Sequence, residues 1–255
     1  MSSRAALLLA LALLLPAAAA GQTTTETLVL RGHAQTLRLS GQRDGYPAIV
    51  SSGDGGWVHL APQVAAMLAA RGFFVVGFDT KAYLESFTSG ATTLTVSNVP
   101  ADYVALARFT TRWSSQKPIL IGVSEGAALS LLAATDPAVK AAVAGVIGMG
   151  LGDENELAWR WKDSLIYLTH GVPNEPTFST IALAGRVAPT PLAAINATHD
   201  EYVPAGEVDR ILAAAQQPKR LWMIASADHR FSDNQAELAL RLFEAIAWVH
   251  ANQPQ

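Results

Sequence analysis

The stretch PILIGVSEGAALSLLAA, residues 118–134, decides the fold of this chain. The apolar run Pro118–Val123 predicts a buried strand, and the run Glu125–Ala134 predicts a helix that follows it at once. The serine between them, Ser124, stands in the pattern G-x-S-x-G. A sharp strand-to-helix turn needs small residues on either side, and it holds the hydroxyl out above the sheet at the positive end of the helix. The stretch therefore predicts that Ser124 is a nucleophile. The alternative is an ordinary glycine-bounded turn, which can have the same sequence pattern.

Strand-like and helix-like runs alternate on both sides of this stretch. Further buried strands are predicted at Pro47–Ser51, Phe73–Phe78, Val143–Gly150, Pro191–Ala197 and Arg220–Ala225. Helices are predicted at Val58–Arg71, Ala101–Trp113 and Ala236–His250. Two short stretches near the start, Thr27–Arg31 and Thr36–Ser40, predict an antiparallel edge. The alternation indicates an α/β chain with a mostly parallel sheet and helices on both faces. With the serine turn in place, it predicts the α/β-hydrolase fold.

The chain has 255 residues, of which half are hydrophobic, so one globular domain is expected over residues 21–255. The segment from Leu151 to about Pro189 interrupts the alternation. It carries Trp159, Trp161 and Tyr167 with little strand or helix pattern. Its position predicts a small cap insertion, about 151–189, over the C-terminal edge of the sheet, where it would shape substrate choice.

The first twenty residues have the three-part layout of a secretory signal peptide. Arg4 supplies a positive start, Ala5–Leu15 is an unbroken apolar run, and Ala18 and Ala20 form a cleavage site before Gly21. The apolar run is too short to cross a bilayer core of roughly 30 Å as a helix. Cleavage and a periplasmic or secreted protein are therefore expected, with an uncleaved membrane anchor as the alternative.

Composition argues against several kinds of partner. The net charge is −3 and no run of lysine and arginine occurs, so nucleic acid is not an expected partner. The chain has no cysteine, which excludes disulfides and thiolate metal sites. Neither a metal-ligand spacing nor a nucleotide-binding glycine pattern is present. We predict no cofactor.

A serine hydroxyl needs an adjacent base to become a good nucleophile. His229 lies just beyond the last predicted strand, where this fold carries its base, and the expected chain order is Ser, acid, His. Asp200 follows the strand at Pro191–Ala197 and would orient the imidazole and stabilise its charged form. Asp153, after the preceding strand, is the rival for this role. Asp228 is a third carboxylate, but its adjacency in sequence does not aim it at the ring.

The oxyanion formed during acyl transfer needs backbone N–H donors. Glu125, the residue after the nucleophile, is predicted to supply one. The loop SSGDGGW, residues 51–57, follows a predicted strand at the place of the second donor, for which Asp54 and Gly55 are the candidates. Small residues there let the backbone approach the substrate closely.

Three motifs together resemble the bacterial AcvB/VirJ virulence-factor family of α/β-hydrolases. They are the loop at residues 51–57, the run GFFVVGFD at residues 72–79, and the serine turn at residues 122–126. The resemblance covers the chain from about Ala48 to the C-terminus. It implies a periplasmic hydrolase whose substrate class is aminoacylated phosphatidylglycerol, with lysyl-phosphatidylglycerol the named case. Such a substrate would bring the protein into peripheral contact with membrane lipid. Val123 and Glu125 depart from the family pattern, in which an aromatic residue is expected at each.

The sequence leaves several functions open. The main hypothesis is ester hydrolysis through an acyl-enzyme, with a peptidase or thioesterase using the same groups. The alternative is a non-catalytic periplasmic chaperone or secretion accessory on the same scaffold. Retention of serine, acid and histidine in the expected order favours the enzyme. Glu125 is also a candidate for recognising a cationic acyl group. The alternative is that Glu125 is a solvated charge at the N-terminus of the helix, where a negative side chain is favourable. The sequence does not indicate the oligomeric state.

Overall fold

A single sheet of eight strands organises the part of the chain that the computed structural model describes, residues 23–160, 175–204 and 206–254. The strands are β1 (Thr24–Leu30), β2 (His33–Gly41), β3 (Pro47–Ser51), β4 (Phe74–Phe78), β5 (Ile119–Val123), β6 (Gly145–Met149), β9 (Leu192–Ala197) and β10 (Lys219–Ile224). Their order across the sheet is β1-β2-β4-β3-β5-β6-β9-β10. Only β2 pairs antiparallel with its neighbours, β1 and β4, and all other pairs are parallel. The antiparallel edge and the parallel centre agree with the sequence-based prediction.

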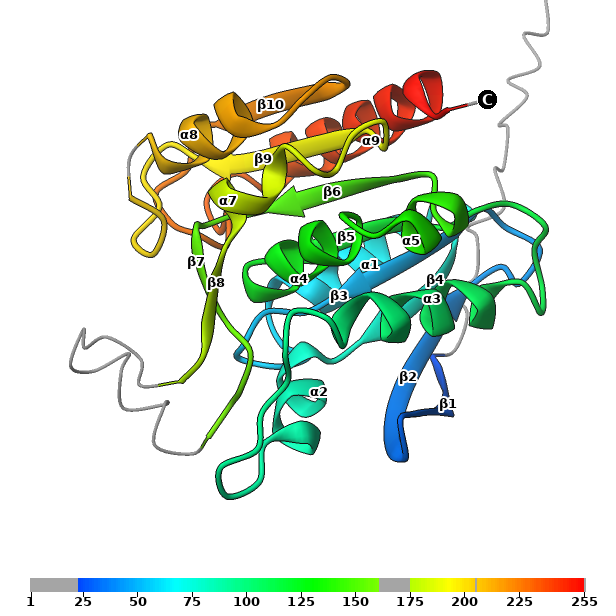
Figure 1. Ribbon diagram of the computed structural model, residues 1–255. Helices are drawn as coiled ribbons and strands as arrows, with labels where there is room; N and C mark the ends of the chain where they lie inside the picture. Colours follow the sequence, from blue (N-terminus) through cyan, green and yellow to red (C-terminus); the bar gives the residue numbers. More distant parts are fainter. Residues whose placement is uncertain (1–22, 161–174, 205, 255) are drawn as a thin grey trace, which may run out of the picture.

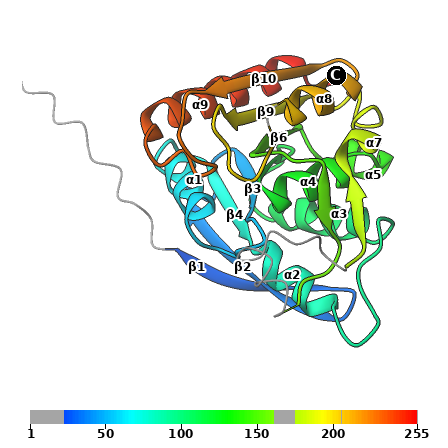
Figure 2. The same ribbon diagram turned by 90° about the vertical axis from the view of Figure 1, so that its left-hand side faces the viewer.

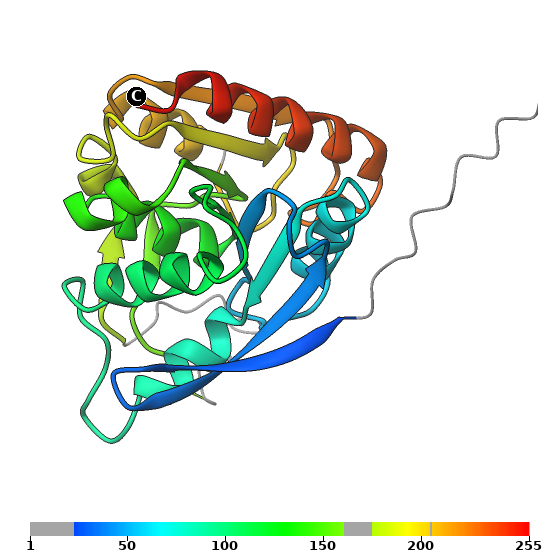
Figure 3. The same cartoon turned by 90° about the vertical axis from the view of Figure 1, so that its right-hand side faces the viewer.

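Helices cover both faces of this sheet, as Figures 1 and 3 show. Helices α1 (Leu60–Ala69) and α9 (Gln235–Asn252) lie on one face, and α3 (Val99–Thr110), α4 (Glu125–Ala133) and α5 (Pro137–Ala142) lie on the other. Two hydrophobic clusters correspond to these two layers. Three further helices complete the described part: α2 (Thr80–Phe87), α7 (Thr180–Ala184) and α8 (Glu207–Ala214). A view along another direction shows the same two layers (Figure 2).

The central strands are buried along their whole length because both of their faces are covered. Every residue of β3, β4, β5, β6 and β9 is buried. Such strands are continuous apolar runs rather than alternating ones, which is the pattern from which they were predicted. Helix α4 follows β5 with one residue between them, so the sheet edge where β5 ends faces the start of this helix.

The segment after β6 leaves the main sheet, as expected for an insertion. Strands β7 (Glu154–Glu156) and β8 (Thr177–Ser179) pair antiparallel with each other and form a separate two-stranded sheet. Trp159 follows β7, and the Lys81 ammonium lies 4.0 Å above its ring centre. Trp161 and Tyr167 lie outside the described residues. Figure 1 shows the hairpin extending from the body of the protein.

An ion-pair network ties the antiparallel edge to the helical layer. Arg31, in the turn between β1 and β2, donates two hydrogen bonds from Nε and Nη2 to the Asp102 carboxylate of α3, the Nη2 bond at 2.8 Å. The Tyr83 hydroxyl of α2 donates to the same carboxylate at 2.6 Å. Asp102 is almost fully buried, so this pairing satisfies a charge that would otherwise be costly. No helix among the described residues is long and apolar enough to span a membrane.

Candidate active site

Ser124 occupies a strained turn between β5 and α4. Its φ of 50° and ψ of −120° lie outside the regions that non-glycine residues usually adopt. The Ser124 N–H donates to the Met149 carbonyl at 2.8 Å, which holds the turn against the end of β6. A Cβ at Gly122 would lie 2.2 Å from the Gly126 carbonyl oxygen, and one at Gly126 would lie 2.3 Å from the Ser52 carbonyl oxygen. The glycines of the motif are therefore required by close backbone contacts.

His229 and Asp200 form a hydrogen-bonded pair behind this serine. The His229 Nδ1 lies 2.7 Å from the Asp200 Oδ2, and both side chains are nearly buried. The other carboxylate oxygen, Oδ1, accepts from the N–H groups of Tyr202 and Val203, each at 2.9 Å. Burial raises the pKa of Asp200, but the hydrogen bonds from His229 and from the backbone outweigh it and lower the pKa overall. Asp200 therefore stays ionised and can stabilise a positive imidazole.

The opposite ring nitrogen of His229 is free to act on a substrate. His229 Nε2 is buried and makes no hydrogen bond within the described part of the chain. A neutral imidazole whose Nδ1–H donates to Asp200 presents an Nε2 lone pair, the form needed in a general base. The His229 N–H also donates to the Glu201 Oε2 at 2.8 Å, which fixes the loop that carries the ring.

The other carboxylates considered for the acid have structural roles. Asp153 Oδ1 accepts from the Ser179 hydroxyl at 2.7 Å and from the Ile181 N–H at 2.8 Å, at the start of α7. Asp228 Oδ1 accepts from the N–H groups of Arg230 and Ser232, which shapes the turn after β10. Neither carboxylate has a hydrogen bond to the imidazole in the structure. Of the predicted acids, only Asp200 does.

Two glycines that sequence reasoning did not single out shape the site. A Cβ at Gly150 would lie 2.3 Å from the His229 Cε1, and Gly150 has a φ of +62°. A Cβ at Gly53 would lie 3.3 Å from the Ser124 Cβ. Both glycines follow apolar strands in the sequence. Glycine is needed at these positions because particular side chains lie against them in the folded protein. No sequence signal identifies those neighbours.

Ser124 and His229 line one pocket of about 470 Å³. The pocket wall is formed by the loop after β3, the start of α1, the serine turn and the loops that follow β9 and β10. It includes Asp54, Gly55, His59, Tyr202 and Arg230. His59 has a φ of 54°, so its backbone is strained as well. The Tyr202 ring stands edge-on to the His229 ring, with 5.4 Å between their centres. Sequence reasoning did not assign His59, Tyr202 or Arg230 to the site.

The predicted oxyanion-hole residues lie beside the serine. Asp54 and Gly55 share the pocket wall with Ser124, and Glu125 is the first residue of α4. The first N–H groups of a helix have no partner within the helix, so the Glu125 N–H is available to an oxyanion. The loop that carries Asp54 and Gly55 thus places backbone groups at the pocket wall.

Two carboxyl groups near the serine have raised pKa values. Desolvation raises the pKa of Glu125 well above its usual value, and the charges of Asp54 and Glu156 raise it further. Desolvation also raises the pKa of Asp54, against its backbone hydrogen bonds and the charges of His229 and Lys81. Burial is the largest cause of both shifts, so the neutral form of each carboxyl group is favoured relative to a carboxyl group in water.

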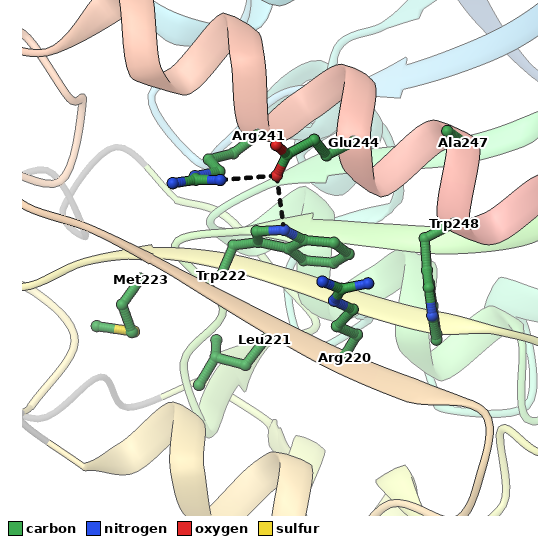
Figure 4. A pocket seen from close by; sticks show the side chains of 8 residues that line it. All are labelled: Arg220, Leu221, Trp222, Met223, Arg241, Glu244, Ala247 and Trp248. Carbon is green, nitrogen blue, oxygen red and sulfur yellow. Dashed lines mark hydrogen bonds and ion pairs between the residues drawn. The ribbon is translucent and has the colours of Figure 1, made fainter.

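The structure also has a second pocket, of about 670 Å³, at the outer edge of the sheet (Figure 4). It lies between β10 and α9, and three of its polar side chains contact one another. Trp222 donates its indole N–H to Glu244 at 3.1 Å, and Arg241 pairs with the same carboxylate at 2.8 Å. The Arg220 guanidinium lies 4.6 Å from the Trp222 ring centre. None of the residues that line this pocket belongs to the serine site. Among the described residues, no cluster of three or more histidines and carboxylates has the arrangement of a metal site.

Comparison with known proteins identifies both a family and a fold. Residues 46–249 match the family described as bacterial virulence protein VirJ. The esterase domain of a Rhodothermus marinus protein has a TM-score of 0.61 at 20% identity, with 90% of this chain and 98% of that chain covered. The α/β hydrolase GrgF from Penicillium sp. sh18 has a TM-score of 0.65 at 14% identity, with 90% and 99% covered.

A third solved structure is described as a membrane phospholipase A and a bacterial virulence factor. Its TM-score is 0.60 at 12% identity, and the similarity covers 89% of this chain and 86% of that chain. At such identities the likeness concerns the fold alone, which is the α/β-hydrolase fold predicted from the sequence. No curated protein matches the sequence of this chain.

Proposed function

The chain belongs to the VirJ family of bacterial virulence proteins, and from that membership and the site geometry we propose that it is a serine hydrolase that cleaves carboxylic esters. One observation carries the proposal. Ser124 and His229 line the same pocket, and Asp200 holds the far side of the imidazole at 2.7 Å. Hydrolytic triads are recognised by this geometry of roles rather than by position in the sequence.

The proposed reaction proceeds through an acyl-enzyme. His229 Nε2 takes the proton of the Ser124 hydroxyl while Ser124 Oγ forms a bond to the ester carbonyl carbon. The resulting oxyanion accepts hydrogen bonds from the Glu125 N–H and from the loop at Asp54 and Gly55. When the carbon–oxygen bond to the leaving alcohol breaks, the imidazolium returns its proton to that oxygen. A water molecule then gives a proton to Nε2 while its oxygen bonds to the acyl carbon. The bond between that carbon and Ser124 Oγ breaks, the imidazolium returns its proton to Oγ, and the acid is released.

Asp200 contributes to both halves of this cycle. Its carboxylate fixes the tautomer in which Nδ1 carries the proton, and it stabilises the positive ring that forms at each attack. The low pKa of Asp200 supports this role, because a protonated acid would supply no negative charge. The strained backbone of Ser124 supports the role of the nucleophile, since such strain gathers at functional sites.

We extend the proposal to aminoacyl-phosphatidylglycerol, with lysyl-phosphatidylglycerol as the specific substrate. Support comes from the family resemblance. The ester cleaved would join the amino acid to the glycerol headgroup. The products would be the free amino acid and phosphatidylglycerol. The protein would act at a membrane surface in the periplasm, after removal of residues 1–20.

Activity-based labelling tests the proposal most directly. The purified mature protein would be treated with a fluorophosphonate, and the modified residue would be identified by peptide mass spectrometry. In parallel, hydrolysis of short-chain esters, long-chain esters and aminoacyl-phosphatidylglycerol vesicles would be measured. Labelling at Ser124 together with turnover of any ester class supports the enzyme. Absence of both would favour the alternative, a non-catalytic periplasmic chaperone or secretion accessory.

A further inference from the structure

One permanent positive charge lines the pocket of Ser124 and His229. Among the described residues that form the pocket wall, Arg230 is the only lysine or arginine. It directly follows His229 in the chain. A guanidinium keeps its charge at every physiological pH, and its planar set of N–H donors matches the paired oxygens of a carboxylate or a phosphate. The wall therefore contains a group that is suited to an oxygen anion.

The Arg230 guanidinium has no partner among the described residues. The residue is exposed, and its side chain makes neither a hydrogen bond nor an ion pair with them. The nearby Asp228 carboxylate accepts hydrogen bonds from backbone N–H groups instead. Arg241, by contrast, pairs with two carboxylates of its own helix. The charge of Arg230 is thus available to a group that arrives with a ligand.

The backbone that carries Arg230 is held in place on both sides. The Arg230 N–H donates to Asp228 Oδ1 at 2.9 Å, and the Arg230 carbonyl accepts from Gln235 Nε2 at 3.1 Å. The next residue, Phe231, is fully buried and has a φ of 55°, which is a strained value for a residue other than glycine. Such strain persists only where the surrounding structure enforces it, and it gathers at functional sites. A fixed backbone with a free charged side chain is the arrangement expected of a binding group.

The described pocket wall holds no counter-ion for Arg230. Asp54 is the one acidic residue among the described residues of the wall. Burial raises the pKa of Asp54, and the charges that act against this rise are those of His229 and Lys81. The neutral form of Asp54 is therefore favoured relative to a carboxyl group in water. The ionised Asp200 is hydrogen-bonded to His229. The counter-charge for Arg230 is left to the ligand.

We infer that Arg230 is a specificity-determining residue that binds a negatively charged oxygen group, a carboxylate or a phosphate, on the ester substrate. The inference rests on the proposed ester hydrolysis and makes it more specific, because it selects acidic esters over neutral esters of similar size. The guanidinium donates N–H bonds to the anion while the ester carbonyl lies at Ser124. A neutral amide in place of the anion has no charge and only one acceptor oxygen, so it binds more weakly.

Matched pairs of esters test this role of Arg230. Monoethyl succinate and ethyl succinamate differ by carboxylate against amide on the acyl side. The butanoyl esters of 3-hydroxypropanoate and 3-hydroxypropanamide differ in the same way on the alcohol side, and those of glycerol 3-phosphate and glycerol differ by a phosphate. The measured quantity is the ratio of kcat/KM within each pair, so that a general change in turnover cancels. In at least one pair the acidic ester should be favoured by about 10-fold, the lower end of the range for a charge-assisted hydrogen bond, because Arg230 is exposed to water.

Three variants at this position separate charge from shape. Arg230→Gln should bring the ratio close to one, Arg230→Lys should keep part of it, and Arg230→Glu should reverse it to below one. Arg108→Gln is the matched control, because Arg108 is exposed on α3, has no side-chain partner among the described residues and does not line the pocket. It should keep the wild-type ratio. The wild-type ratio should also fall as sodium chloride is added, since salt screens exposed charges.

Binding to a protein without the nucleophile separates this inference from the proposed reaction. The same ester pairs would be titrated by calorimetry into Ser124→Ala protein and into a double variant that also carries Arg230→Gln. Tighter binding of the acidic esters, lost in the double variant, supports the role of Arg230 even if wild type hydrolyses none of the esters. That failure would count against the proposed hydrolysis alone.

Two results would overturn the inference. One is an equal ratio of kcat/KM in wild type and Arg230→Gln, and the other is equal binding of the acidic and neutral esters to Ser124→Ala protein. If the inference holds, the pair with the largest ratio identifies whether a carboxylate or a phosphate is recognised, and on which side of the ester bond.

Discussion

Gly150 lies so close to His229 that the imidazole occupies the space of a missing side chain. A Cβ built on Gly150 would come within 2.3 Å of the ring Cε1 and 2.9 Å of both ring nitrogens. Gly150 follows β6, whereas His229 follows β10, so the contact joins segments far apart in the chain. The His229 ring is therefore positioned by the lack of a side chain at Gly150 as well as by its hydrogen bond to Asp200.

Gly150→Ala should accordingly displace the imidazole and lower kcat/KM for any ester by about 100-fold or more, since small misplacements of a catalytic group are costly. The φ of +62° adds a stability loss of about 1–2 kcal/mol. Gly32→Ala is the matched control: it has a φ of +90° but no atom within 4 Å of the new Cβ. It should lose comparable stability and keep its activity. If both variants hydrolyse esters at the wild-type rate, the contact has no bearing on catalysis.

Ser124→Ala should abolish ester hydrolysis and fluorophosphonate labelling while the protein remains folded. Loss of the nucleophile of a triad typically costs a factor on the order of 10⁴ or more in kcat. Removing the hydroxyl leaves the strained turn in place, and circular dichroism and thermal unfolding would check that the fold persists. Ser97→Ala, at an exposed loop position, is the control. A folded Ser124→Ala protein with full activity would rule out Ser124 as the nucleophile.

Asp200→Asn should damage catalysis far more than Asp153→Asn. The first change removes the negative charge beside His229 Nδ1 and should lower kcat by about 10⁴-fold. The second leaves an oxygen that can still accept from Ser179 and Ile181, so we expect nearly normal kcat and a stability loss below about 1 kcal/mol. Both variants would be compared on the same ester. The reverse ranking would assign the acid to the loop after β6.

Glu125→Gln should make the ligand-free protein more stable, and the gain should depend on pH. The folded-state pKa of Glu125 is raised above its unfolded value, so the folded protein holds this proton more tightly. Stability from this group is present below the unfolded pKa and is lost as pH rises through the folded pKa. The free energy of unfolding of the variant should therefore match that of wild type near pH 4. At higher pH it should become larger than that of wild type, by an amount within the common range of about 0.5–3 kcal/mol. Denaturant unfolding at several pH values measures this difference in the free energy of unfolding. A difference that is negative, or that does not change with pH, would contradict the claim that burial raises the pKa of Glu125.

The exported protein should begin near Gly21. The residues Ala18 and Ala20 have the small side chains that signal peptidase requires, and the preceding apolar run is short. N-terminal sequencing of protein from the periplasmic fraction would identify the first residue. A protein that retains Met1 and sediments with membranes would indicate an anchor instead.

The parts of the fold that depend on local pattern could be predicted from the sequence. The apolar runs that became β3 to β6 and β9 were each predicted to within two residues, because strands buried on both faces are continuous apolar runs. The bounds of β10 were predicted equally well, but this strand lies at the sheet edge and is partly exposed rather than buried. The order of Ser124, Asp200 and His229 along the chain was the basis for choosing them, and in the structure Asp200 contacts His229 while Ser124 and His229 line one pocket. Each lies in the turn or loop that follows a strand.

Other features depend on tertiary contacts and could not be predicted. Helix α2 begins where the Asp79 side chain accepts a hydrogen bond from the Ala82 N–H. A single capping residue in a polar stretch is too weak a signal to predict a helix from the sequence. Helix α8 was likewise not anticipated. The position of Arg230 and Tyr202 at the pocket follows from the loops around His229, and only the folded chain shows which side chains face the pocket.

The β7–β8 hairpin has a consequence for how such a protein can diversify. Its two strands pair with each other, and it shares no ladder with the eight-stranded sheet. Ser124, Asp200 and His229 all lie outside the hairpin, in segments that follow strands of the main sheet. Strand β7 nevertheless contacts α4, the helix that begins directly after Ser124. If Ser124 is the nucleophile as proposed, variation in the hairpin would alter the surroundings of the serine turn without adding or removing a strand of the main sheet.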